Sequence, residues 1–188
     1  MVPPFLILLG GWGAYLSAAF TVLTFLTALV FFAKGQPFGT INDVSSVLQV
    51  LFMIPLALAL NRLLPAGVRI WVFLATAVGI SGMLISALGQ ILLVFRRIDF
   101  EGSMKFFPAG AAIGVWLMVS SILALVTGMF PSGFAWVGIL AGLGYLLIVT
   151  GFLTGGQKHP LFYLGGGVLV LSYPVWAIWL GHLLRNYL

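Results

Sequence analysis

Long apolar runs alternate with short polar stretches along this chain. Five stretches contain no Asp, Glu, Lys or Arg, and they cover 1–33, 44–61, 70–95, 106–157 and 159–184. An α-helix needs about 20 residues to cross the roughly 30 Å hydrocarbon core of a bilayer. The fourth stretch is too long for one crossing, and Pro131, Ser132 and Gly133 form a turn signal in its middle. The pattern therefore predicts six crossings.

This pattern predicts an all-α integral membrane protein with six transmembrane helices in a compact bundle, forming a single transmembrane domain over 1–188. The helices are expected near 8–33, 44–63, 69–95, 107–130, 134–153 and 162–184. The polar loop 96–105 divides the chain into two three-helix halves. Two such halves would be inverted relative to each other, an arrangement that is common among transporters.

The composition excludes a water-soluble globular protein. Hydrophobic residues make up 62% of the chain and charged residues only 6%, whereas soluble domains carry about 25% charged residues. The eight basic residues are scattered, so nothing indicates nucleic-acid binding. The absence of cysteine excludes disulfides, thiol catalysis and cysteine-ligated metals. The first residues carry no positive charge, so we expect no cleavable signal peptide.

The basic residues are divided unequally between the two sides of the predicted bundle. We call the side on which the first helix begins side A and the other side B. Side A holds Arg62, Arg69 and Arg185, and side B holds Lys34, Arg96, Arg97, Lys105 and Lys158. The excess of basic residues favours side B as the cytoplasmic side, with both termini outside.

Small residues recur at intervals of three or four along several predicted helices. Helices associate in lipid where small side chains let their backbones approach closely. The stripes comprise residues 75, 79, 82, 86 and 89; residues 10, 14, 17, 21, 24 and 28; residues 110, 114, 121, 124 and 128; and the pair Gly138 and Gly142. We predict that these stripes are helix–helix contacts in a bundle with little room for a wide aqueous pore.

No charged residue lies in the middle of a predicted span, and the three carboxylates, Asp43, Asp99 and Glu101, are assigned to side-B loops. This pattern argues against a proton relay, a voltage sensor and intramembrane acid–base catalysis. The two glutamines Gln49 and Gln90 are each expected about 9 Å inside side B, at one level of neighbouring helices. They would form either an interhelical hydrogen bond or the polar floor of a pocket open to side B.

Aromatic residues surround a proline inside the last predicted helix. Tyr173, Trp176 and Trp179 lie beside or after Pro174, which is expected to kink the helix. They are candidates for the lining of a groove that binds a hydrophobic ligand. For the two tryptophans, anchoring at the membrane interface on side A is the favoured interpretation.

His182 follows these aromatic residues near the end of the same helix. A neutral imidazole could ligate the metal of a tetrapyrrole, although a side chain that reaches the interface explains the position more simply. No helix carries paired histidines, so we predict no metal site. The sequence assigns no cofactor.

The segment from Ser172 to Gly181, together with the six-span layout, resembles a group of small prokaryotic membrane proteins classified as domains of unknown function. This resemblance implies six helices and a prokaryotic source. It implies no activity and no site residues.

These observations favour a non-enzymatic multi-pass protein of the cell membrane. It would be an accessory subunit of a larger membrane complex or a binder of a lipid, quinone or pigment. Its expected partners are the bilayer and other membrane subunits or further copies of itself. The alternative is a small transporter or channel for a neutral solute, which the two halves and the two glutamines would suit. An enzyme is not expected, because no catalytic set of residues is recognisable.

Overall fold

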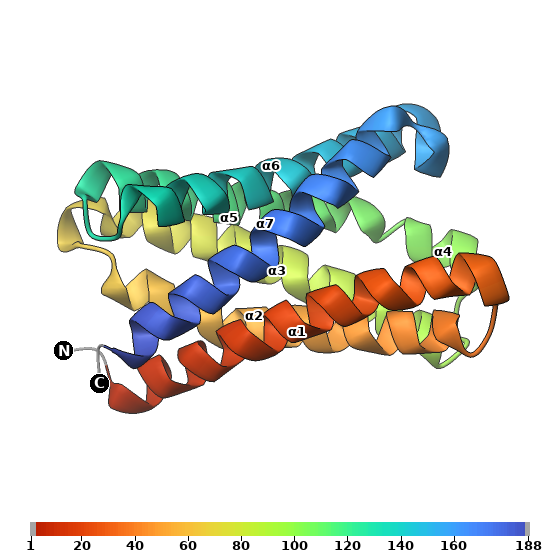
Figure 1. Cartoon of the computed structure of the whole chain (residues 1–188), viewed down its shortest axis with the longest axis horizontal. Coiled ribbons are helices and arrows are strands. Elements are labelled where there is room, and N and C mark those ends of the chain that lie inside the picture. Colours follow the sequence, from red (N-terminus) through yellow and green to blue (C-terminus); the bar gives the residue numbers. More distant parts are fainter. Residues whose placement is uncertain (1–2, 187–188) are drawn as a thin grey trace.

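Six long helices make up most of the computed structural model, which describes residues 3–186 (Figure 1). All six are long and apolar enough to cross a membrane, as predicted for a multi-pass membrane protein. Within residues 3–186 there is no strand. The helices are α1 (Pro4–Lys34), α2 (Phe38–Leu63), α3 (Arg69–Val94), α5 (Gly110–Thr127), α6 (Ser132–Gly155) and α7 (Pro160–Arg185).

Short elements connect the long helices. They are the helix α4 (Phe100–Met104) and the 3₁₀ turns η1 (Ala66–Val68), η2 (Phe107–Ala109) and η3 (Gly156–Lys158). Asp99 caps α4, because its side chain accepts a 2.7 Å hydrogen bond from the backbone N–H of Gly102. This short helix lies within the polar loop 96–105, where the pattern of apolar residues predicts no helix.

Several predicted boundaries differ from the observed helix ends, and two of these errors have a physical reason. The second helix begins at Phe38 rather than at 44, so Asp43 lies inside α2 and not in a loop. A carboxylate within the first turns of a helix can still lie at headgroup level, so its charge does not mark the helix start. The fourth helix ends at Thr127 rather than 130, because Gly128 adopts a left-handed backbone conformation with φ 62°. Gly128 is therefore a helix cap and not part of a packing stripe.

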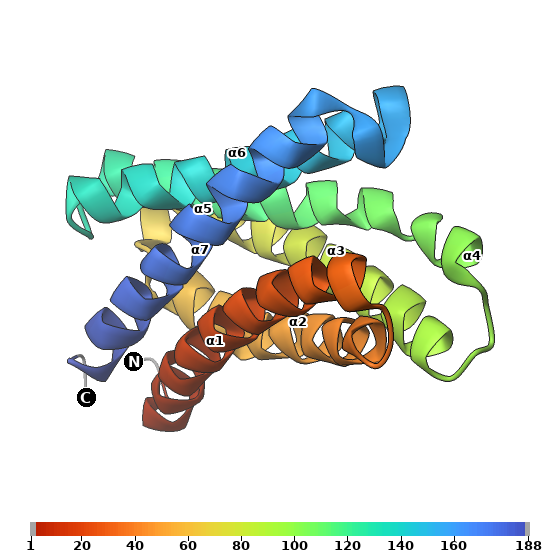
Figure 2. The same cartoon turned by 45° about the vertical axis from the view of Figure 1, so that its right-hand side comes forward.

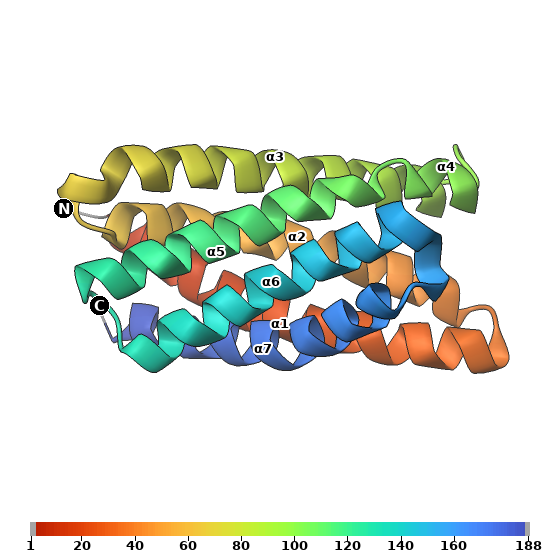
Figure 3. The same ribbon diagram turned by 90° about the horizontal axis from the view of Figure 1, so that it is seen from above.

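The six long helices form a closed ring that follows the order of the chain. Each packs mainly against its two neighbours in sequence, and α7 closes the ring on α1. The view from above shows the antiparallel succession (Figure 3). Two views show α7 meeting α1 at side A and diverging from it toward side B (Figures 1 and 2). The loop with α4 separates α1–α3 from α5–α7 along the chain.

Glycines bring neighbouring backbones together, as the stripes predicted. A Cβ atom at Gly82 of α3 would lie 2.7 Å from the carbonyl oxygen of Ala109. At Gly114 it would lie 2.8 Å from the carbonyl oxygen of Gly142, and at Gly142 2.7 Å from that of Gly114. These distances are shorter than van der Waals contact, so α3, α5 and α6 can approach this closely only where the side chain is absent.

Large side chains fill the interior of the ring. Trp116 of α5 and Trp176 of α7 are both fully buried, and their rings meet edge to face with centroids 6.0 Å apart. Because α5 and α7 are not neighbours in the ring, this contact crosses its interior. Met53 and Leu56 of α2 are also fully buried. The prediction of a compact bundle without a wide pore is therefore confirmed for the part of the chain that the structure describes.

The burial of Trp176 corrects the prediction of an interfacial anchor. The side chain shares one face of α7 with Tyr173 and Leu180, and all three have no exposed surface. This face is directed into the ring, so helical periodicity rather than depth along the helix determines its environment. Three other side-A tryptophans do lie at the surface, with exposed fractions of 52% for Trp12, 62% for Trp71 and 57% for Trp136.

We expect Gly82→Leu to lower the free energy of unfolding by about 1–3 kcal/mol, because the new side chain would push α3 away from Ala109. Thermal unfolding of the purified protein in detergent measures the effect. The matched control is Gly166→Leu, at a glycine of α7 where a Cβ would meet no atom within 4 Å. Equal melting temperatures for the two variants would contradict a packing role for the α3 stripe.

Candidate functional site

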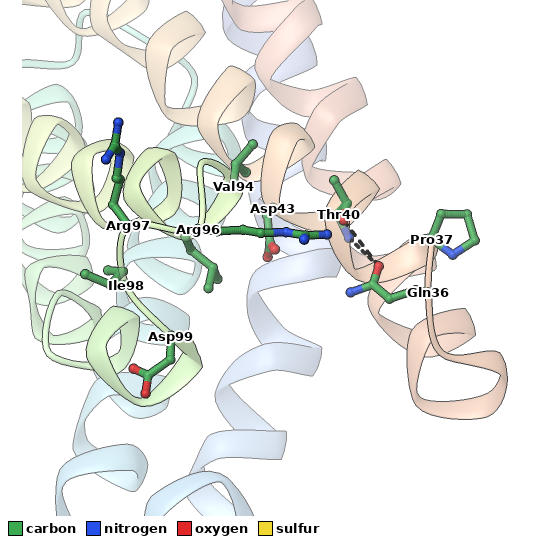
Figure 4. A pocket seen from close by; sticks show the side chains of 10 residues that line it. Gln36, Pro37, Thr40, Asp43, Val94, Arg96, Arg97, Ile98 and Asp99 are labelled. Carbon is green, nitrogen blue, oxygen red and sulfur yellow. Dashed lines mark hydrogen bonds between the residues drawn. The ribbon is translucent and has the colours of Figure 1, made fainter.

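A pocket of about 710 Å³ opens at side B, where the start of α2 meets the end of α3 (Figure 4). Its walls carry charged groups of both signs, with Arg96 and Arg97 after α3, Asp43 in α2, and Asp99 at the start of α4. The remaining lining residues are Gln36, Pro37, Thr40, Leu93, Val94 and Ile98. The residues that line the pocket thus include charged groups of both signs beside an apolar wall.

The α2 side of the pocket is held in place by hydrogen bonds. The side-chain oxygen of Gln36 accepts two of them, one from the backbone N–H of Thr40 and one from the Thr40 hydroxyl, each at 3.2 Å. Asp43 lies one turn further along α2 and is half-buried. These bonds fix the first turn of α2, on which the carboxylate of Asp43 stands.

The α3 side is formed by an arginine in an unusual backbone conformation. Arg96 has φ 53° and is the only residue other than glycine with positive φ among the described residues 3–186. Its N–H donates to the Leu93 carbonyl at 2.9 Å, and the Arg97 N–H donates to the Leu92 carbonyl at 2.8 Å. This pair of bonds is the Schellman helix end, in which the left-handed position is usually glycine.

The arginine at this position has an energetic cost and a directional consequence. A left-handed conformation costs a residue with a side chain about 1–2 kcal/mol, and such strain is concentrated at functional sites. In Figure 4 the Arg96 side chain extends across the pocket toward Asp43 and Thr40 of α2, whereas Arg97 points away. The helix end thus aims one guanidinium into the pocket and the next one out of it.

Charged groups of both signs around one pocket suit a ligand that itself carries both charges. A guanidinium binds phosphate or carboxylate with paired hydrogen bonds, and a carboxylate accepts hydrogen bonds from an ammonium group. Within residues 3–186 no group of three or more His, Asp or Glu side chains could hold a metal ion. Arg96 and Asp43 suit the pocket to recognition by charge and hydrogen bonding.

The two glutamines singled out in the sequence do not meet. Gln49 lies near the middle of α2 and its amide donates a 3.2 Å hydrogen bond to the hydroxyl of Tyr145 in α6. Gln90 lies one turn before the end of α3, and its side-chain oxygen is buried without a hydrogen-bond partner. Each glutamine therefore lies six residues from a residue of the side-B pocket, Gln49 from Asp43 and Gln90 from Arg96, but the hydrogen bond of Gln49 goes to α6 and not to Gln90.

Tyr173 makes the second polar contact near the middle of the bundle. Its hydroxyl donates a 2.8 Å hydrogen bond to the hydroxyl of Ser17 in α1, which in turn donates to the Ala14 carbonyl at 3.0 Å. Both residues are fully buried. This bond joins α7 to α1 at the closure of the ring. Tyr173 therefore faces the protein interior and does not line a groove open to lipid.

The other three candidates on α7 are separated by their environments. The indole N–H of the buried Trp176 has no hydrogen-bond partner, and its ring stacks on Phe134 with centroids 5.5 Å apart. Trp179 is half-buried and meets Phe134 edge to face. His182 is exposed, with its Nε2 atom 3.2 Å from the side-chain nitrogen of Asn186. The tryptophans thus share an aromatic cluster from which His182 is separate.

Sequence reasoning missed three residues that the structure makes important. The hydrogen bonds of Tyr145 and Ser17 cannot be predicted from local sequence, because their partners, Gln49 and Tyr173, lie 96 and 156 residues away along the chain. The pattern of charges places Arg96 in a loop, but nothing in a single sequence reveals its positive φ. The signal that was present for Ser17 is its place in the stripe of small residues in the first helix.

Comparisons with known protein families, with curated proteins and with solved structures find no match for this chain. The resemblance to small prokaryotic membrane proteins therefore stays a prediction.

We expect Tyr173→Phe and Ser17→Ala to show coupled effects on stability, because each removes one side of the same buried hydrogen bond. Hydrogen bonds between membrane helices have coupling energies of about 0.6 kcal/mol on average, with a maximum of about 1.7 kcal/mol. A double-mutant cycle measured by unfolding in mixed detergent tests this. Pairing Tyr173→Phe with Ser81→Ala, an exposed serine that bonds within its own helix, gives an uncoupled control. Strict additivity for Ser17 would contradict the contact.

Proposed function

We propose that this chain is a non-enzymatic multi-pass protein of the cell membrane that binds an amphiphilic lipid at the side-B pocket. The headgroup carries both a phosphate and a primary ammonium group, as in phosphatidylethanolamine. This proposal specifies one of the hydrophobic-ligand functions that the sequence favours. The observation that carries it is the strained Arg96, which holds a guanidinium in a pocket that also contains carboxylates.

The two charges of such a headgroup have separate partners in the pocket. Arg96 provides paired donors for the phosphate oxygens, which accept hydrogen bonds from guanidinium in this manner. Asp43 accepts hydrogen bonds from the ammonium group on the opposite wall. A headgroup with a quaternary amine has no N–H to donate, so Asp43 would distinguish it from a primary amine by the missing hydrogen bonds.

The surroundings of the pocket suit a ligand with acyl chains. Phe95, next to Arg96 in sequence, is 71% exposed, and Phe100 beside Asp99 is 54% exposed. Val44 of α2 is also exposed beside Asp43. Apolar side chains therefore follow directly on the charged lining, which supports an amphiphile rather than a fully soluble ion.

We expect Arg96→Gly to separate stability from binding. The variant should lose the preference for phosphatidylethanolamine over phosphatidylcholine, while its stability is unchanged or higher by up to about 1.5 kcal/mol. Relief of the left-handed strain favours folding by about 1–2 kcal/mol, and the greater freedom of glycine in the unfolded chain offsets about 0.5–1 kcal/mol of this. Native mass spectrometry of the full chain with both lipids measures binding, and thermal unfolding measures stability.

Lys105→Gln serves as the control for this experiment, since it removes a side-B cation that does not line the pocket. It should keep the lipid preference of the unaltered protein. An Arg96→Gly variant that still prefers phosphatidylethanolamine would contradict the proposal. Loss of the preference in both Arg96→Gly and Lys105→Gln would also contradict it.

A second candidate, a transporter for a small neutral solute, is favoured by the Gln49–Tyr145 hydrogen bond. The bond joins α2 and α6, which are not neighbours in the ring, so it provides polar groups inside the bundle near its middle. Met53, Leu56 and Trp116 are nevertheless fully buried and occupy the same interior. This packing supports the lipid-binding proposal over transport.

We therefore expect liposomes that contain the protein to admit glycerol no faster than empty liposomes, as measured by light scattering after an osmotic step. The fully buried side chains of Met53, Leu56 and Trp116 occupy the interior through which the solute would have to pass. Glycerol entry that is faster with the unaltered protein and returns to the level of empty liposomes with Tyr145→Phe would favour the transporter instead.

A further inference from the structure

A second pocket, of about 530 Å³, lies at side A between the end of α2 and the start of α3. We infer that this pocket binds the phosphate-bearing headgroup of an anionic lipid, such as phosphatidylglycerol. Arg62 from α2 and Arg69 from α3 both line it, together with Asn61 and the turn residues Ala66 and Gly67. The pocket is at the opposite side of the bundle from the one that contains Arg96.

The electrostatic setting of this pocket differs from that at side B. No aspartate or glutamate lines it. The three carboxylate side chains of the chain all lie at side B: Asp43 in the first turns of α2, Asp99 at the cap of α4, and Glu101 in α4. Both arginines are exposed, so their guanidinium groups are open to a ligand. A pocket with two cations and no anion selects a net negative ligand, whereas the side-B pocket selects a neutral pair of charges.

The backbone in front of α3 leaves room for a ligand. In the 3₁₀ turn Ala66–Val68, which leads directly into α3, the Val68 N–H donates to the Pro65 carbonyl at 3.2 Å and the Arg69 N–H donates to the Ala66 carbonyl. A Cβ at Gly67 would meet no atom within 4 Å, so the space in front of this turn is open. The wall between the two helices is fixed by Asn61, whose amide donates a 3.1 Å hydrogen bond to the hydroxyl of Thr76.

Apolar side chains beside the arginines identify a lipid as the source of the phosphate. Ile70 and Phe73 line the pocket and are 60% and 59% exposed, and Trp71 beside them is also exposed. Tryptophan is enriched at the level of the lipid headgroups. A soluble phosphate would use the arginines alone, whereas a lipid would also place its acyl chains against Ile70 and Phe73.

The test compares Gly67→Asp with Gly67→Asn in the full-length chain. The two side chains have nearly the same shape and fit the open space, so only their charge differs. Native mass spectrometry with an equimolar mixture of phosphatidylglycerol and phosphatidylcholine measures the preference for the anionic lipid. We expect Gly67→Asn to keep this preference and Gly67→Asp to lower it about fivefold, the effect of one unit charge a few ångströms from another in water. Arg62→Gln combined with Arg69→Gln should abolish it.

Equal preference for phosphatidylglycerol over phosphatidylcholine in Gly67→Asp and Gly67→Asn would overturn the inference. Displacement of phosphatidylglycerol by an equal concentration of inorganic phosphate would also overturn it, because the ligand would then be a soluble anion. Binding of phosphatidylethanolamine at side B should be the same in all these variants, so failure here is distinguishable from failure of the proposed function.

Discussion

Close contact between helix backbones at glycines is the constraint on which the rest of this structure depends. Lipid tails are as apolar as leucine, so hydrophobicity alone does not hold helices together in a bilayer. The contact of α6 with α7 illustrates the alternative. A Cβ at Gly165 would lie 2.7 Å from the carbonyl oxygen of Gly144. A Cβ at Gly144 would lie 3.1 Å from the carbonyl oxygen of Gly165. Dispersion between backbones replaces the missing hydrophobic force.

The ring separates two kinds of chemistry along the membrane normal. Its middle contains neutral groups that bond to one another, such as Tyr173 with Ser17 and Gln49 with Tyr145. Its two ends contain the charged pockets, with mixed charge at side B and only positive charge at side A. A neutral interior avoids the cost of burying ions in lipid, and it leaves recognition to the surfaces at the level of the headgroups.

The apolar runs and the stripes of small residues were sufficient to predict the helices and the buried faces, because both depend on local sequence. Asp43 misled the prediction of a boundary, since a charge near a helix end is compatible with either loop or helix. The environment of Trp176 depends on which face of α7 points inward, and the partner of Gln49 depends on the ring. The left-handed Arg96 is a backbone property that no residue pattern encodes.

The bond between Ser17 and Tyr173 spans 156 positions along the chain, and it has a consequence for biosynthesis. Neighbouring helices can pair as soon as each follows its predecessor into the bilayer, but α1 gains its second neighbour only when α7 arrives. Until then the face of α1 that carries the Ser17 hydroxyl and Gly11, the glycine that packs against α7, is directed at lipid or the insertion machinery. Ring closure is thus the final step of assembly, and a ribosome stalled before α7 would leave an open arc of helices.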